Sequence, residues 1–419
     1  DRHFPTKQEG YDKFNAYSHY RANFDVVRAF VDNSADTIDF LKDLGVEYKT
    51  VTIAAYDDPN EVWTFHLPDG LGARVQELLL SAVEHAGVDI FTETPATELI
   101  IEDGKVVGVV AESEGEPLRV GGKAVVLATG GMGSNPELIA KYSWFAPSAY
   151  NMNTLTPLQN MGDGLMMALS AGADDTNIVT CPILAAGARD KAMDSHIGAA
   201  GVQPGAIWIN KTGRRFANEG TAENIGDIGP LYGKQPDGIV WSVLDQANID
   251  RLVENGSEIS IGEFVVFGRP LDRLRMELDQ DVADGVAFAA NTPEELAEKI
   301  GVSPENFAAT VAAYNEACAT GEDKAFFKQE KYLRPLSTPP FYAVALATGT
   351  MGSAGGIRIN GNMQVVDKDY EPIPGLYAVG LDATGLYGDS YNMEVPGAAN
   401  GFAHTSGRIA GRHFAAQQA

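Results

Sequence analysis

The feature that most constrains the fold of this chain is an apolar run near its end that stops at a glycine. Residues 374–380 read PGLYAVG, the pattern of a buried strand, and residues 397–400 read GAAN at the start of a helix predicted over 397–416. Glycine and alanine at such a junction leave out the side chains that hold other groups away from the backbone. The junction therefore predicts either close approach of a flat or phosphorylated molecule, or tight packing of a small-residue helix on a sheet.

The first third of the chain shows the alternation of helix and strand that is typical of an α/β nucleotide-binding layer. Apolar spacing and turn residues predict helices over 23–44 and 71–84, a strand over 88–91, a hairpin of 99–101 with 106–111, and a strand over 123–129. The last strand runs into Gly130 and Gly131, which let the backbone turn beneath a nucleotide. The sequence therefore predicts an α/β fold with a small antiparallel insertion.

The middle of the chain has a different character, because loops rich in Asn, Asp and Gly separate its apolar segments. Two helix starts are marked by a capping residue followed by proline, Thr292-Pro293 and Ser303-Pro304. We interpret this segment as an α+β cap domain inserted into the first domain. The predicted boundaries are 1–133 for the first part of the α/β domain, 134–340 for the cap and 341–419 for the second part.

Composition and charge exclude several classes of function. Asp and Glu number 57 against 31 Lys and Arg, a formal charge of −26, and such a surface repels nucleic acid and anionic lipid. The only cysteines, Cys181 and Cys318, cannot build a metal or disulfide framework. No apolar run approaches the roughly 20 residues that span a bilayer. The expected partner is a small molecule, with no metal site and with the cellular compartment left open.

Several stretches, taken together and in order, resemble the FAD-binding flavoprotein family of fumarate reductase and succinate dehydrogenase. They are residues 34–38 with 44–46, 128–131, 160–164, 210–219, 355–359, 374–380 and 406–411. The resemblance implies a Rossmann-like FAD domain, a mobile cap and an active site between them. Hydride would pass between flavin N5 and an activated carbon–carbon double bond, with a side chain supplying the proton and an unidentified electron donor supplying reducing equivalents.

The resemblance also implies which residues bind the cofactor. They are Ala96, Ala128, Thr129, Gly130, Gly131, Asp163, Gly380, Asp382, Ala399 and Asn400. The family's strand with G-x-G-x-x-G, which holds the FAD pyrophosphate, does not occur in these 419 residues. We therefore expect a Rossmann-like domain that is incomplete at its N-terminus. The alternative function is a non-catalytic or apo fragment of such a flavoprotein, unable to hold FAD.

The substrate side departs from the fumarate reductases. Counting from the family-like motifs, two positions that carry arginine in that family fall at or near Glu223 and Glu394. Like charges repel strongly in a closed site, so a dicarboxylate is disfavoured and a neutral or cationic, hydroxylated or ring-containing substrate is expected. The first candidates for proton transfer are Tyr391 and Glu394, followed by Tyr387 and Glu223. The alternatives are that these tyrosines pack against the cap and that the acids are solvated. The direction of the reaction is left open.

Overall fold

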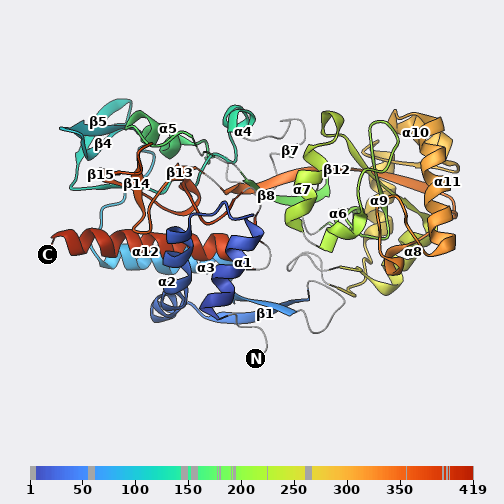
Figure 1. The fold of residues 1–419 in the computed structure, drawn as a ribbon, viewed down its shortest axis with the longest axis horizontal. Helices are drawn as coiled ribbons and strands as arrows, with labels where there is room; N and C mark the ends of the chain where they lie inside the picture. The colour runs from blue at the N-terminus through green and yellow to red at the C-terminus, as the bar shows by residue number, and fades with distance from the viewer. Residues whose placement is uncertain are drawn as a thin grey trace.

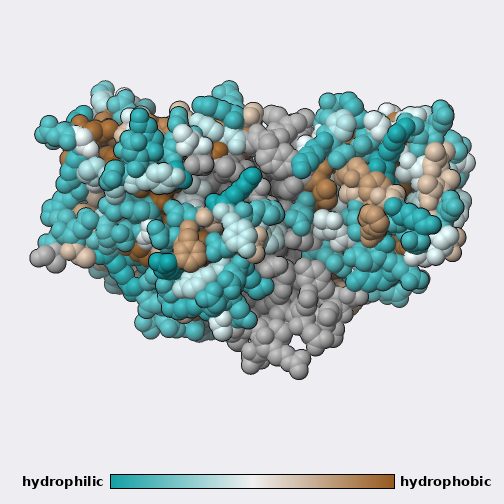
Figure 2. All heavy atoms as spheres, viewed as in Figure 1, coloured by the Kyte–Doolittle hydropathy of each residue, from teal (hydrophilic) through white to brown (hydrophobic). Residues whose placement is uncertain are grey.

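The protein forms two lobes joined through long strands near the middle of the molecule (Figure 1). The computed structural model describes residues 6–54, 62–142, 150–151, 159–176, 178, 181–189, 191, 195–223, 225–259, 267–354, 356–388, 391–392, 395 and 397–418. The face shown in Figure 2 is mostly hydrophilic over both lobes, as the excess of acidic residues requires. In the described part of the chain, no helix combines the length and apolarity needed to cross a membrane.

Among the described helices, four from the first and last parts of the chain belong to the first lobe. They are α1 (Lys7–Tyr17), α2 (Phe24–Asp43), α3 (Leu71–His85) and α12 (Ala398–Gln418). Helix α2 lies along α12, where the rings of Phe30 and Phe402 meet edge to face at 5.9 Å and the hydroxyl of Thr405 donates to that of Thr37. The helices predicted over 23–44, 71–84 and 397–416 are confirmed to within a few residues.

The sheet beside these helices has the order β14-β15-β6. Its strands are β14 (Gln364–Val366), β15 (Pro372–Ala378) and β6 (Val125–Leu127). The register of β15 and β6 is parallel, with Leu376 opposite Val125 and Ala378 opposite Leu127. The two strands predicted to end at glycine turns are therefore neighbours, and because they are parallel both turns lie at the same edge of the sheet. A short parallel pair, β13 (Ile357–Arg358) and β16 (Ala383–Thr384), follows nearby.

Two antiparallel units complete the first lobe. One is β3 (Ala96–Glu102), β4 (Lys105–Ser113) and β5 (Glu116–Gly121), which confirms the predicted hairpin; the other is β1 (Tyr48–Ala54) with β2 (Val62–Pro68). The strand predicted over 88–91 is wrong. Val88, Ile90 and Phe91 are each at least half exposed. A strand exists only through hydrogen bonds to a neighbour, and no described strand pairs with this segment.

The second lobe is built on a mixed sheet of order β11-β12-β10-β9, with β7 and β8 also paired to β12. Its strands are β7 (Tyr150–Asn151), β8 (Cys181–Ala188), β9 (Ile207–Asn210), β10 (Val240–Asp245), β11 (Ala287–Ala290) and β12 (Phe341–Ala354). The helices around it are α6 (His196–Gly201), α7 (Ile225–Gly233), α8 (Gln246–Asn255), α9 (Leu274–Ala283), α10 (Pro293–Ile300) and α11 (Pro304–Thr320). The predicted caps are present, since the hydroxyls of Thr292 and Ser303 accept the N–H groups of Glu295 and Asn306.

The packing of α4, α5 and β12 leads us to propose other domain boundaries than those predicted from the sequence. Helices α4 (Pro136–Tyr142) and α5 (Asp163–Ser170) bury Ile139 and Leu165 in the core of the first lobe, although the boundary was expected at 134. Strand β12 is the central strand of the cap sheet, although the cap was expected to end at 340. A core forms from whatever faces meet in space, so we propose that the cap extends from about β8 to the end of β12.

A buried charge network ties the cap together. The guanidinium of Arg215 donates to both oxygens of Glu219, at 2.9 and 2.6 Å, and to Asp323 at 2.9 Å. The ammonium of Lys328 lies 3.3 Å from Glu219 and donates to the carbonyl of Ala206. Two cations and two anions thus neutralise one another in a region from which water is excluded.

Candidate active site

The two glycine turns of the first lobe meet at one buried carboxylate, that of Asp382 in the short helix η5 (Gly380–Asp382). It accepts the backbone N–H and the hydroxyl of Thr129 and, at 2.9 Å, the N–H of Gly131. The Thr129 hydroxyl in turn accepts the N–H of Gly164 in α5. Burial raises the pKa of Asp382, while the N–H donors of Thr129 and Gly131 act against that rise.

The turn itself requires glycine at two positions. Gly130 and Gly131 have φ of +85° and +81°, in the left-handed region. A Cβ on Gly130 would lie 2.7 Å from the amide oxygen of Asn160, and a Cβ on Gly131 would overlap the hydroxyl of Ser353. This hydroxyl accepts the N–H of Met132, so the tip of β12 helps to shape the turn. The backbone of the turn is therefore held rigidly and is free of side chains of its own.

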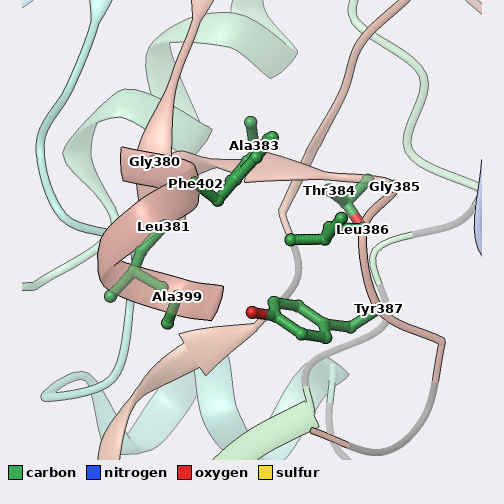
Figure 3. Close-up of a pocket in the computed structure, with 9 residues that line it drawn as sticks. All are labelled: Gly380, Leu381, Ala383, Thr384, Gly385, Leu386, Tyr387, Ala399 and Phe402. Carbon is green, nitrogen blue, oxygen red and sulfur yellow. The ribbon is translucent and has the colours of Figure 1, made fainter. Parts of the chain in front are cut away.

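A small pocket lies between η5, the start of α12 and the loop after β16 (Figure 3). Its walls are Gly380, Leu381, Ala383, Thr384, Gly385, Leu386, Tyr387, Ala399 and Phe402. The beginning of α12 contributes Ala399 and Phe402 to these walls. In Figure 3 the hydroxyl of Tyr387 points toward Ala399. None of these nine described residues carries a charged side chain.

The loop after this pocket carries two tyrosines whose rings are in tilted contact. The ring centroids of Tyr387 and Tyr391 are 5.1 Å apart with an interplanar angle of 41°, and the ring centroid of Phe14 in α1 lies 6.3 Å from that of Tyr387. Burial raises the pKa of the Tyr391 phenol, and hydrogen bonding to the backbone N–H of Ala399 and to Tyr387 partly offsets the rise. Tyr391 is therefore a neutral phenol at physiological pH, with its oxygen against the first turn of α12.

Comparison with known proteins identifies the family. The model of the FAD binding domain family matches residues 7–395, nearly the whole chain. The chain belongs to the FAD binding domain family. A vinyl phenol reductase of Lactiplantibacillus plantarum is 34% identical over 415 residues, covering 95% of this chain and 82% of that protein. The predicted flavoprotein family, with FAD as cofactor and oxidoreductase as class, is confirmed.

Solved structures agree with the fold of an FAD-binding flavoprotein. The open conformation of a flavocytochrome c3 fumarate reductase has a TM-score of 0.68 and 25% identity, covering 98% of this chain and 68% of that one. A 3-ketosteroid delta1-dehydrogenase of Sterolibacterium denitrificans has a TM-score of 0.76 and 18% identity, covering 98% and 89%. The latter similarity shows the shared fold, and both confirm the predicted mixed α/β architecture.

Small residues around the turn and the start of α12 suit a close approach of FAD to the backbone. Gly380, Ala383 and Ala399 leave the start of α12 accessible, and the turn at 129–131 presents bare backbone next to a helix N-terminus, that of α5. These surfaces suit a planar ring and a chain of polar groups. We therefore propose that the turn, Gly380 and the first turn of α12 hold FAD in this chain.

Other residues predicted from the sequence as site residues do not line the pocket. Ala96 pairs with Ala111 in the hairpin, while Ala128, Asp163 and Asn400 are exposed next to the turn or at the helix starts of α5 and α12. Glu223 accepts hydrogen bonds from Lys331 and Tyr332 within the cap and does not line the pocket. Glu394 lies outside the described residues.

The structure adds Asn160 and Ser353, which the sequence-based list omits. Asn160 begins the stretch 160–164 that resembles the flavoprotein family, so it could have been predicted from the sequence. Ser353 carries no local signal, because its contact with the turn arises only from the course of β12.

Replacing Gly131 with alanine should loosen FAD binding and lower the melting temperature. An alanine held in the left-handed backbone conformation of this position costs about 1–2 kcal/mol, and its Cβ would also overlap the hydroxyl of Ser353. Gly172→Ala is the matched control, since Gly172 has φ of +92° but nothing within 4 Å of a Cβ. FAD titration followed by flavin fluorescence should show weaker binding for Gly131→Ala only. Equal FAD affinity in both variants would contradict a role for the turn.

Proposed function

We propose that this chain reduces the carbon–carbon double bond of a neutral, activated alkene, with Tyr391 as the proton donor. The observation that carries the proposal is the contact between the rings of Tyr387 and Tyr391, next to a pocket at the start of α12 whose described residues are uncharged. A phenol that is kept neutral by burial holds its proton until a substrate carbon accepts it.

Bound FAD supplies the hydride in this reaction. The chain's own residues supply and stabilise the proton donor. Helix α12 directs the N–H of Ala399 at the oxygen of Tyr391, so that the phenolate left after proton transfer gains a hydrogen bond and the positive end of the helix dipole. Tyr387 stacks on Tyr391 and fixes its ring. One alkene carbon thus gains a hydride, the other gains the proton, and Tyr391 is reprotonated from solvent.

The pocket favours a neutral substrate. A dicarboxylate needs cationic side chains to replace its hydration, and the described residues that line the pocket include none. The aromatic walls formed by Tyr387 and Phe402 suit a ring-bearing alkene. The similar vinyl phenol reductase acts, by its name, on such a molecule, which supports 4-vinylphenol as the first substrate to test.

The test is an anaerobic assay of the FAD-loaded chain with chemically reduced methyl viologen as electron donor. We expect 4-vinylphenol to be converted to 4-ethylphenol, identified by chromatography, and fumarate to be reduced far more slowly. A protein that remains colourless after incubation with FAD would favour the alternative of a non-catalytic fragment. A yellow protein that reduces fumarate but not 4-vinylphenol would overturn the proposed substrate class.

A further inference from the structure

Strand β12 reaches from the cap into the first lobe (Figure 1). Over its first half it is the centre of the cap sheet, where residues 341–346 pair with β10 and β11. Its register with β8 shifts between Thr350 and Ser353, a β-bulge or irregularity of the ladder. Such a feature bends a strand and gives its side chains a new direction. Beyond it, the end of β12 contacts the glycine turn at residues 129–131.

The side chain of Ser353 makes this contact. Ser353 is fully buried, and its hydroxyl accepts the N–H of Met132 at 3.0 Å. Met132 is itself only 1% exposed, so solvent is a poor substitute for this acceptor. The same hydroxyl fills the space beside Gly131, where a Cβ would overlap it. Because a buried N–H without an acceptor costs free energy, Ser353 fixes the backbone directly after Gly131.

Two glycines at the end of β12 pack on η5, the short helix beside the pocket. A Cβ on Gly352 would lie 2.7 Å from Cδ1 of Leu381, and one on Gly356 would overlap the carbonyl oxygen of Asp382. Leu381 lines the pocket (Figure 3), and the carboxylate of Asp382 accepts the N–H of Gly131. The end of β12 therefore touches both parts of the surface proposed to hold FAD, the turn and η5.

We propose that Ser353 is a positioning residue that couples the cap to FAD binding. Through its bond to Met132, the cap sheet holds the turn in the geometry that binds FAD, and bound FAD in return stabilises the cap sheet. The inference rests on the placement of FAD at the turn and is independent of the proposed alkene substrate. Coupling between two parts of a protein is reciprocal in free energy, so both effects must occur together.

The coupling has a simple physical basis. Without the Ser353 hydroxyl, the N–H of Met132 needs another acceptor, and in the FAD-free protein the turn can reach one by moving. FAD binding then has to restore the bound geometry, and the free energy spent on this lowers the affinity. The cap sheet, for its part, no longer responds to whether the turn is occupied.

The first measurement is FAD affinity, by titration of the FAD-free proteins followed by flavin fluorescence. Ser242→Ala is the matched control for Ser353→Ala, because Ser242 is also fully buried in the cap sheet but its hydroxyl has no hydrogen-bond partner among the described residues. We expect Ser353→Ala to bind FAD about 10-fold more weakly, the effect of one lost hydrogen bond, and Ser242→Ala to stay within about 2-fold of the wild type.

The second measurement is hydrogen exchange in peptides from β10, which pairs with the opposite end of β12 from Ser353. In the wild type and in Ser242→Ala, saturating FAD should slow exchange both in the turn and in β10. In Ser353→Ala, saturating FAD should still protect the turn but should protect β10 less. A residue that only stabilises the fold would instead lower the protection of β10 equally with and without FAD.

Gly352→Ala disturbs the same contact from another side, since its Cβ would press on Leu381, and it decides the test if Ser353→Ala does not fold. It should bind FAD more weakly and transmit less protection to β10. Unchanged FAD affinity together with unchanged protection of β10 overturns the inference, while weaker binding by Gly131→Ala would still place FAD at the turn. If Gly131→Ala also binds FAD as the wild type does, that placement fails and the inference fails with it.

Discussion

Replacement of Tyr391 by phenylalanine should lower kcat for alkene reduction by about 100-fold or more, the usual contribution of a positioned general acid. The variant keeps the ring that stacks on Tyr387 and removes only the hydroxyl that meets Ala399. FAD content and melting temperature should therefore stay close to those of the wild type. The measurement is anaerobic turnover of 4-vinylphenol under saturating donor, so that the chemical step limits the rate.

The pH profile separates a proton donor from a packing residue. The donor works only when protonated, and burial raises the pKa of Tyr391 above its ordinary value of 10.0. Activity should thus persist through neutral pH and fall only as the pH rises through that raised pKa, and this descent should vanish in Tyr391→Phe. Tyr387→Phe is the matched control and should lose less activity. If Tyr387→Phe loses more than Tyr391→Phe, or if only Glu394→Gln is inactive, the assignment of the donor is wrong.

Lys328→Met should destabilise the cap by about 3–5 kcal/mol, the cost of leaving a buried charge without its partner. Lys328 and Glu219 are fully enclosed, and without the ammonium group the two carboxylates of the network face Arg215 alone. Urea unfolding followed by tryptophan fluorescence reports on this region, because Trp208 is adjacent to the network and its backbone N–H donates to Glu219. A change smaller than 1 kcal/mol would show that water or a rearrangement compensates the missing charge.

Two further variants make the test specific. Lys211→Met removes a cation from an exposed pair with Asp237 and should change stability by less than about 1 kcal/mol. Adding Glu219→Gln to Lys328→Met should recover part of the loss, since the remaining carboxylate and guanidinium then balance.

The same network determines the acid stability of the cap. Burial alone would raise the pKa values of Glu219 and Asp323, but Lys328 acting on Glu219 and Arg215 acting on both carboxylates lower them. Their contribution to stability is therefore present above the ordinary values of 4.5 and 3.8 and is lost as the pH falls through the lowered ones.

Several helices and strands of the first lobe could be predicted from the sequence. The strand of residues 374–380, the strand ending at Gly130 and the final helix were predicted from local patterns, and the structure places the first two side by side. Such elements are predictable because apolar periodicity and turn residues act over a few neighbouring positions. The strand expected over 88–91 shows the limit, since its apolar pattern says nothing about whether a partner strand exists.

The sequence alone was enough to predict the family, the cofactor and the two capped helices of the inserted lobe. The contacts of Asp382 with the turn of Thr129 and Gly131, and the place of β12 in the sheet of the second lobe, are visible only in the tertiary structure. The residues of each such contact are far apart along the chain. Their meeting depends on how whole elements pack, and no local pattern of residues encodes that packing.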